Sequence, residues 1–204
     1  MVISEKRENV LRAALELVAE HGFHGAPISS IANQAGVGMG TIYRYFANKD
    51  ILITELFQEL HDKIHASLLK GYLPHQPLRE RFLHVSSALL RYFIANPLEF
   101  RFLEQYLNSP YGIAFRRAKL LETEDDDLFR RIFDDGVAQR LVKDLPLIVL
   151  FALSFGPILG VARDHILGFI DLDDSLIMQT IHACWDGIKK QQHCGDPIFI
   201  STIA

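Results

Sequence analysis

One short segment of the chain, residues 36 to 49, has the residue types that bind a nucleic-acid backbone. If this segment is a helix, Thr41, Arg44 and Tyr45 share one face, because positions three and four apart are neighbours on a helix surface. A hydroxyl, a guanidinium and a phenol can hydrogen-bond to phosphate oxygens and base edges, and glycine amides at a helix start favour anions. The pattern predicts a DNA-binding helix.

The segment before it has the pattern of a short helix that ends in a tight turn. Its apolar residues recur with the period of one buried helix face: Ile28, Ile31, Ala32 and Ala35. Gly36 follows where such a helix would end, and in the next helix Ile42 and Phe46 share the face opposite the polar one. We therefore expect a helix, a turn and a second helix.

The stretch from Ala35 to Lys49, AGVGMGTIYRYFANK, resembles the recognition helix and exit turn of the TetR/AcrR family of transcriptional regulators. The family-like pattern covers about residues 5 to 60. The resemblance implies an all-α protein with a three-helix helix-turn-helix DNA-binding domain at residues 1–50. A larger helical effector-binding and dimerisation domain would follow at residues 51–190, with a C-terminal tail at 191–204.

The resemblance also implies which residues touch DNA. The predicted DNA-binding residues are Gly38, Met39, Gly40, Thr41, Tyr43, Arg44, Tyr45 and Lys49. In the family pattern Gly40 and Thr41 approach the floor of the groove, and Tyr43 contacts a base or a phosphate. Phosphates are held by Arg44, Tyr45 and Lys49. Met39 occupies a position that is often basic, so a thymine-methyl contact is expected there in place of a charge contact.

Composition fits a compact protein with its own core. The chain has 204 residues, of which 49% are hydrophobic, enough for one large or two modest domains. The formal net charge of −4 is unusual for a DNA-binding protein, so binding must depend on local placement of charge. Two cysteines are too few for a disulfide framework, and residues 1 to 10 lack the apolar core of a signal peptide. We expect a cytoplasmic protein with no cofactor.

The rest of the chain predicts further helices separated by prolines. The expected ranges are 5 to 21, 50 to 70, 78 to 95, 97 to 108, 111 to 122, 125 to 142, 146 to 170 and 175 to 190. The acidic run from Glu124 to Asp127 suits the start of a helix better than a metal site. Asp173 or Asp174 can cap the last helix.

The last helix carries one continuous apolar stripe, formed by Ile177, Ile181, Cys184, Trp185 and Ile188. The family resemblance implies that the last two helices pair with those of a second subunit, which makes this stripe the predicted homodimer interface. The alternative is packing within one subunit.

The middle of the chain is rich in aromatic residues. Similar proteins hold a small-molecule effector among these helices, and the predicted effector-binding residues are Phe93, Phe100, Tyr106, Phe155 and His165. The alternative is ordinary core packing. The aromatic content favours a planar or hydrophobic effector, and the acidic balance favours a neutral or cationic one. The fourth helix, at 50 to 70, is the expected route from effector to DNA.

The sequence also allows four alternative interpretations. His61 and His65 have the spacing of zinc ligands in a metal-dependent enzyme, but no third ligand is evident and a solvated helix face is favoured. Residues 145 to 162 are uncharged, yet their prolines and glycines favour a buried helix over a membrane span. A DNA-binding protein of this kind that responds to no small molecule, such as a nucleoid or division factor, stays open, as does activation in place of repression.

Overall fold

A computed structural model describes residues 2–121 and 128–191. Within those ranges the chain is all-α, as expected, and an isolated bridge between Val142 and Lys189 is the β-type pairing it contains. The helices are α1 (Val2–His21), α2 (Ile28–Gln34), α3 (Met39–Tyr45), α4 (Lys49–Leu69), α5 (Leu78–Ala95), α6 (Pro97–Leu107), α7 (Pro110–Leu121), α8 (Leu128–Ala138), α9 (Leu147–Ile166) and α10 (Asp174–Ile188).

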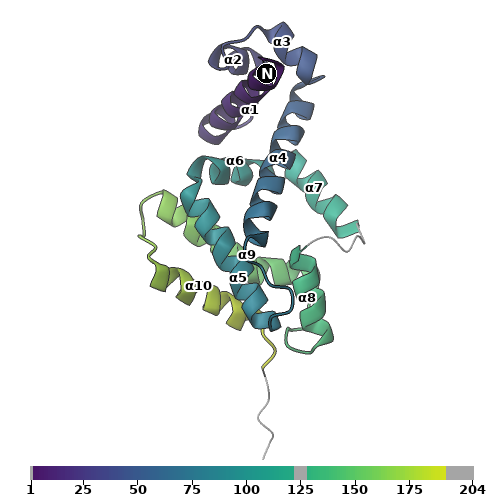
Figure 1. The fold of residues 1–204 in the computed structure, drawn as a ribbon, viewed down its shortest axis with the longest axis vertical. Coiled ribbons are helices and arrows are strands. Elements are labelled where there is room, and N and C mark those ends of the chain that lie inside the picture. Colours follow the sequence, from purple (N-terminus) through teal and green to yellow (C-terminus); the bar gives the residue numbers. More distant parts are fainter. Residues whose placement is uncertain (1, 122–127, 192–204) are drawn as a thin grey trace, which may run out of the picture.

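Figure 1 shows the arrangement: α1–α3 form an N-terminal unit at one end, and α4 runs from it into a helical body of α5–α10. Side-chain caps fix two helix starts. Asn48 accepts a hydrogen bond from the amide of Ile51 at 2.9 Å, and Asp173 accepts one from the amide of Leu176 at 2.7 Å. The capping role expected for Asp173 is therefore confirmed.

Helix α8 ends earlier than the predicted residue 142. The amides of Leu141 and Val142 both bond to the carbonyl of Gly136, at 2.9 and 3.1 Å, and Arg140 has a φ of 59°. A residue with positive φ after the last turn ends a helix, because the amides that follow it donate to carbonyls of that last turn. The acidic run from Glu124 to Asp127, expected at the start of this helix, lies outside the described residues.

The N-terminal unit has its own hydrophobic core, but helices outside the unit complete it. Five residues of α4 belong to this cluster: Leu52, Ile53, Leu56, Phe57 and Leu60. Helix α6 adds Phe102 and Tyr106, which are 0% and 4% exposed. The packing therefore continues past residue 50, and α4 is not the only element that joins the N-terminal unit to the body.

Aromatic contacts hold α6 in this position. The rings of Phe57 and Tyr106 stack with centroids 3.8 Å apart and an angle of 4° between their planes. Phe102 meets the ring of Phe23, in the turn after α1, edge to face at 6.4 Å. Such pairs add to the free energy gained by burial. Together they fix α6 against both α1 and α4.

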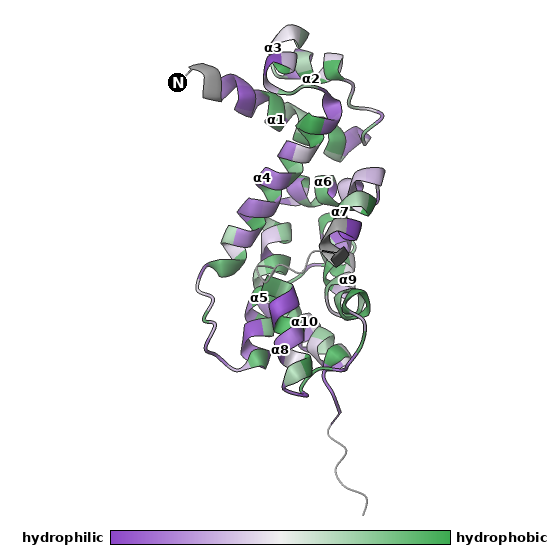
Figure 2. Cartoon of the chain, turned by 90° about the vertical axis from the view of Figure 1, so that its right-hand side faces the viewer, coloured by the Kyte–Doolittle hydropathy of each residue, from purple (hydrophilic) through white to green (hydrophobic). Residues whose placement is uncertain are grey.

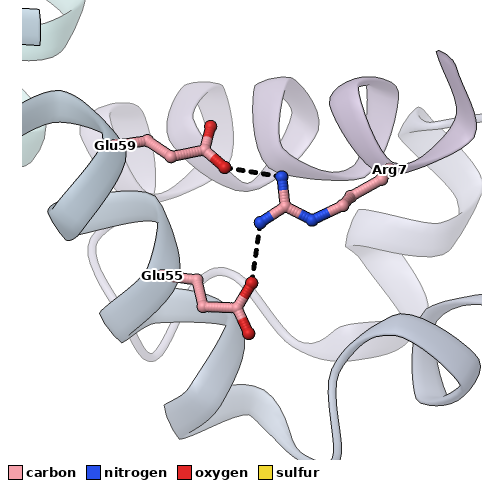
Figure 3. A network of polar contacts seen from close by, with 3 residues as sticks. All are labelled: Arg7, Glu55 and Glu59. Atoms are coloured by element: carbon pink, nitrogen blue, oxygen red, sulfur yellow. Dashed lines mark hydrogen bonds and ion pairs between the residues drawn. The ribbon is translucent and has the colours of Figure 1, made fainter. Parts of the chain in front are cut away.

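Polar contacts reinforce the same junction. Figure 3 shows Arg7 of α1 donating to Glu55 and Glu59 of α4, at 2.7 and 2.5 Å. The hydrogen bonds to these carboxylates raise the pKa of Arg7, and its guanidinium also lies 5.4 Å from the ring centre of Phe46. Because one cation holds two residues one turn apart, it sets the angle between α1 and α4.

A second polar cluster links α4, α5 and α6. Glu99 of α6 is only 8% exposed, accepts a hydrogen bond from Lys63 of α4 at 2.6 Å and accepts another from the Tyr92 hydroxyl of α5. Burial and this hydrogen bond raise the pKa of Tyr92. A buried carboxylate is costly without hydrogen-bond donors, so these two contacts connect α4, α5 and α6 at Glu99.

The apolar stripe of α10 does not form the surface that was predicted. All five residues (Ile177, Ile181, Cys184, Trp185 and Ile188) are buried within the subunit. Trp185 packs against Phe82 of α5 with centroids 5.4 Å apart, and burial raises the pKa of the Cys184 thiol to about 11. Side chains already covered inside one chain cannot be covered again by a second one. The assignment of this stripe to a dimer interface is wrong, and the alternative of packing within the subunit is observed.

Helix α9 has one buried face and one uncovered apolar face. Leu150, Phe155 and Ile158 are buried in the body, whereas Ile148 and Leu153 are 51% and 41% exposed. Figure 2 shows α9 at the right-hand edge of the molecule, with no other element beyond it. By length and composition alone α9 could span a membrane, and only 28% of its apolar stretch is buried. The prediction of a buried helix therefore holds for one face only.

The burial of the α10 stripe predicts that Ile181→Glu unfolds the subunit, because Ile181 is 0% exposed. Placing a carboxylate in that core should cost several kcal/mol, on the order of 3 or more. Chemical denaturation followed by circular dichroism measures the loss. Gln179→Glu, on the exposed side of the same helix, is the control and should be near neutral. A folded Ile181→Glu monomer of normal stability would contradict this packing.

Candidate nucleic-acid interface

Helix α3 has the two faces that its sequence predicts. Ile42 and Phe46 are both 0% exposed and pack in the core of the N-terminal unit. Met39 and Tyr43 are 52% and 54% exposed, Arg44 is exposed, and Thr41 and Tyr45 are half-buried. A short helix gains its stability from its buried face, so a partner can contact the exposed side chains of Met39, Tyr43 and Arg44 without loss of fold.

The start of α3 is unobstructed. A Cβ atom added at Gly38 or Gly40 would meet no atom within 4 Å, so the backbone here can approach a surface closely. Gly36, in the turn between α2 and α3, has a φ of +67°, a conformation that other residues rarely adopt. This glycine lets the chain reverse between the two helices. All three glycines are exposed, and Figure 1 shows α2 and α3 at one end of the molecule.

The side chains of Arg44 and Tyr45 contact each other at the surface of α3. The guanidinium of Arg44 lies 5.1 Å from the ring centre of Tyr45 and donates a hydrogen bond to its hydroxyl at 3.0 Å. Stacking on an aromatic ring holds the planar cation in a defined direction. An oriented guanidinium can offer two donors to one phosphate at a smaller cost in side-chain entropy.

Lys49 has a partner inside the subunit that sequence reasoning did not foresee. Its ammonium donates to the carbonyl of Phe23 at 2.5 Å, which ties the start of α4 to the turn after α1. Burial lowers the pKa of Lys49, while the neighbouring Asp50 raises it. The expected phosphate contact would therefore have to share this ammonium with a structural hydrogen bond.

Tyr111 of α7 is a further anchor at the same place. Its hydroxyl donates to Asp50 at 2.5 Å, and its ring lies 5.2 Å from that of Phe23. Burial and the hydrogen bond to Asp50 raise the pKa of Tyr111 to about 12. Asp50 and Tyr111 are 61 residues apart, and no sequence pattern connects them.

The five predicted effector-binding residues do not surround one cavity. Phe93, Phe100 and Phe155 are 2%, 1% and 8% exposed in the core of the body. Tyr106 belongs to the other core, where burial raises its pKa. His165 interacts with the carbonyl of Ile170 and accepts from the amide of Leu172, which shapes the turn before α10. The alternative of ordinary packing describes these residues better.

Two cavities lie elsewhere in the described part of the chain. One, of about 210 Å³, lies between α6, α7 and α9. The other, of about 400 Å³, lies between α1, α4 and the start of α6 and has a leucine floor and a charged rim. None of the five predicted effector residues lines either cavity, and both cavities border α6.

His61 and His65 lie on one face of α4 with ring centroids 6.5 Å apart. Among the residues that the structure describes, no group of three histidine, cysteine, aspartate or glutamate side chains could hold a metal ion. His61 instead lies beside Phe57 and Phe115 at the edge of the aromatic junction, with centroids 6.1 and 6.2 Å away.

A helix-turn-helix unit with an exposed polar recognition helix, mounted on a helical body, defines a class of DNA-binding regulators. Comparison with known proteins specifies the class. Residues 10–56 match the family model of bacterial regulatory proteins of the tetR family, and residues 77–189 match the tetracyclin repressor-like C-terminal domain. The chain belongs to the TetR family of transcriptional regulators.

Two of the similar proteins match this chain over most of their length, and a third matches over a short segment. A TetR-family regulator of known structure from Vibrio parahaemolyticus is 32% identical, with a TM-score of 0.73 over 91% of this chain and 99% of its own. An uncharacterized HTH-type regulator from Haemophilus influenzae is 26% identical over 90% of this chain and 95% of its own. The fatty acid metabolism regulator protein of Bacillus subtilis is 48% identical, but over only 26% of this chain and 28% of its own.

The position of Lys49 predicts a structural cost when its donor is removed. Lys49→Met keeps most of the unbranched apolar stem of the side chain but cannot donate to the Phe23 carbonyl, so the free energy of unfolding should fall by about 1 kcal/mol. Urea denaturation measures this, with Lys70→Met, exposed at the end of α4, as the control. If both variants are equally stable, the contact with Phe23 contributes nothing.

Proposed function

We propose that this protein is a ligand-responsive transcriptional repressor of the bacterial cytoplasm that binds a palindromic operator as a homodimer and is released by a small effector. The observation that carries the proposal is that Ile42 of α3 and Phe46, which directly follows the helix, are buried, whereas Tyr43 and Arg44 of α3 are exposed. The family match to a repressor-like C-terminal domain supports repression over activation.

The exposed side of α3 suits the major groove. Tyr43 is 54% exposed, the Arg44–Tyr45 pair follows it in the chain, and the backbone of Gly38 and Gly40 is open at the start of the helix. In this arrangement the pair contacts phosphates, and Tyr43 and Met39 reach base edges or thymine methyl groups. Because the net charge is −4, binding depends on these local groups.

A second copy of the chain is the occupant that we propose for the uncovered face of α9. Ile148, Val149 and Leu153 are 51%, 37% and 41% exposed on this face. Exposed large apolar residues on one face favour burial against another helix, and a two-fold axis makes one such face complementary to itself. This proposal keeps α9 at the interface and replaces the α10 stripe with the outer face of α9.

In a dimer that binds DNA, the distance between the two N-terminal units must match the DNA. Two recognition helices must enter major grooves about 34 to 36 Å apart, one helical turn of DNA. Each unit is fixed to its own body through α4 and α6. An effector that changes this attachment in both subunits changes the spacing of the two helices, and affinity for the operator falls.

Tyr43→Ala should weaken operator binding by about 1 to 3 kcal/mol if Tyr43 reads a base, without loss of fold because the side chain is 54% exposed. Gel-shift titration with the DNA upstream of the protein's own gene measures it. Leu73→Ala, 56% exposed in the loop after α4, is the matched control and should bind like the wild type. Equal affinity of the two variants would remove Tyr43 from the interface.

Leu153→Glu should convert the dimer to a folded monomer, since Leu153 is exposed within the subunit but covered in the proposed dimer. Burial of two symmetric carboxylates at a two-fold axis costs several kcal/mol, on the order of 3 or more. Sedimentation velocity gives the mass and circular dichroism the fold, with Leu73→Glu as the control. A Leu153→Glu dimer, or a wild-type monomer at micromolar concentration, would contradict the assignment.

A further inference from the structure

The cavity of about 210 Å³ between α6, α7 and α9 has an amphipathic lining. Leu103 and Leu107 of α6 and Leu159 of α9 supply apolar walls, and two glycines of α9 leave room beside them. Pockets for drug-sized ligands occupy about 300 to 1,000 Å³, so this one fits a small molecule or one end of a longer one.

The cavity is lined by more positive than negative side chains. Two arginines, Arg116 and Arg163, and one carboxylate, Glu104, line it. Arg163 directs two nitrogens at the same Glu104 oxygen, Nε at 2.8 Å, so these two charges neutralise each other. Arg116 donates to the carbonyl of Leu107 at 2.6 Å and has no carboxylate partner among the described residues. The lining therefore carries one cation that is held only by a neutral oxygen.

We propose that this cavity binds a small amphipathic anion, an alkyl chain ending in a carboxylate or a phosphate, with its anionic end on Arg116. The inference rests on the proposed function of a ligand-responsive regulator and specifies the ligand. An anion exchanges the neutral carbonyl of Leu107 for a charged acceptor, a stronger hydrogen bond, while the alkyl chain covers the leucine walls. The acidic balance of the whole chain pointed to a neutral or cationic effector, but the local charge has the opposite sign.

The position of the cavity connects it to the DNA-binding unit. Leu103, Glu104 and Leu107 lie on the cavity side of α6, while Phe102 and Tyr106 of the same helix complete the core of the N-terminal unit. Leu103 packs against both cores. A ligand that moves α6 therefore moves a helix on which α1 directly packs.

Arg116 is placed to start that movement. Its hydrogen bond fastens α7 to the last turn of α6, and α7 in turn holds the start of α4 through Tyr111 and Asp50. When an anion takes over the guanidinium, the end of α6 loses its bond to α7. The ligand then favours a conformation in which α6 and α7 are free to move apart, which is the differential binding that regulation requires.

The test is isothermal titration calorimetry of the full-length protein with octanoate and octyl phosphate, and with octylamine as the probe of opposite charge. The wild type should bind at least one of the two anions and not the amine. Arg116→Gln should weaken anion binding about tenfold or more, the loss expected for one charge-assisted hydrogen bond. Arg117→Gln, on an exposed neighbouring residue that does not line the cavity, should leave it unchanged.

Three results would overturn the proposal: no binding of either anion to the wild type, equal binding of the amine, or equal anion affinity of Arg116→Gln and Arg117→Gln. Preference for octanoate identifies a carboxylate ligand, and preference for octyl phosphate identifies a phosphate ligand. Calorimetry needs no DNA, so it tests the cavity separately from operator binding. A protein that binds the anion but never leaves its upstream DNA would keep the site and lose the proposed response.

Discussion

The packing of α6 into the core of the N-terminal unit is the constraint on which the rest of the structure depends. Helices α2 and α3 have seven residues each, far below the length at which a helix is stable alone. Their stability comes from a shared core, and that core is closed by Phe57 of α4 and by Phe102 and Tyr106 of α6. The DNA-binding surface is therefore built on a helix of the body.

This arrangement explains how a surface change in the body can reach the recognition helix. Helix α6 has two apolar sides, and each of them packs in a different core. Helix α7 is bonded both to the end of α6 and to the start of α4. Arg7 adds a second fixed angle between α1 and α4. A change in α6 cannot be absorbed locally, since close-packed cores shift between arrangements and do not deform smoothly.

The sequence allowed much of α3 to be predicted, because periodicity states which face of a helix is buried. The two faces of α3, the bounds of α5 and the cap at Asp173 followed from local patterns. Periodicity does not state what covers a face. The α10 stripe is covered by α5 and α9, not by a second subunit, and the uncharged stretch of α9 reads the same for a core, a bilayer or a dimer.

The same limit applies to the site. Aromatic content predicted an effector pocket, but large apolar side chains serve a filled core equally well, and Phe93 and Phe100 fill one. The contacts of Lys49 with Phe23, of Tyr111 with Asp50 and of Arg163 with Glu104 join residues 26 or more apart. Such pairs depend on tertiary packing, which no single-sequence pattern encodes.

The dependence of the N-terminal unit on α6 is tested most directly by hydrogen exchange, resolved by residue, on Tyr106→Leu. Loss of the stack on Phe57 should speed exchange of amides in α1 and α3. Phe93→Leu, an equally buried change in the core of the body, should leave those amides at wild-type rates relative to the body. If Tyr106→Leu speeds exchange only within α6 and α7, the N-terminal unit is independent of α6 and the account is contradicted.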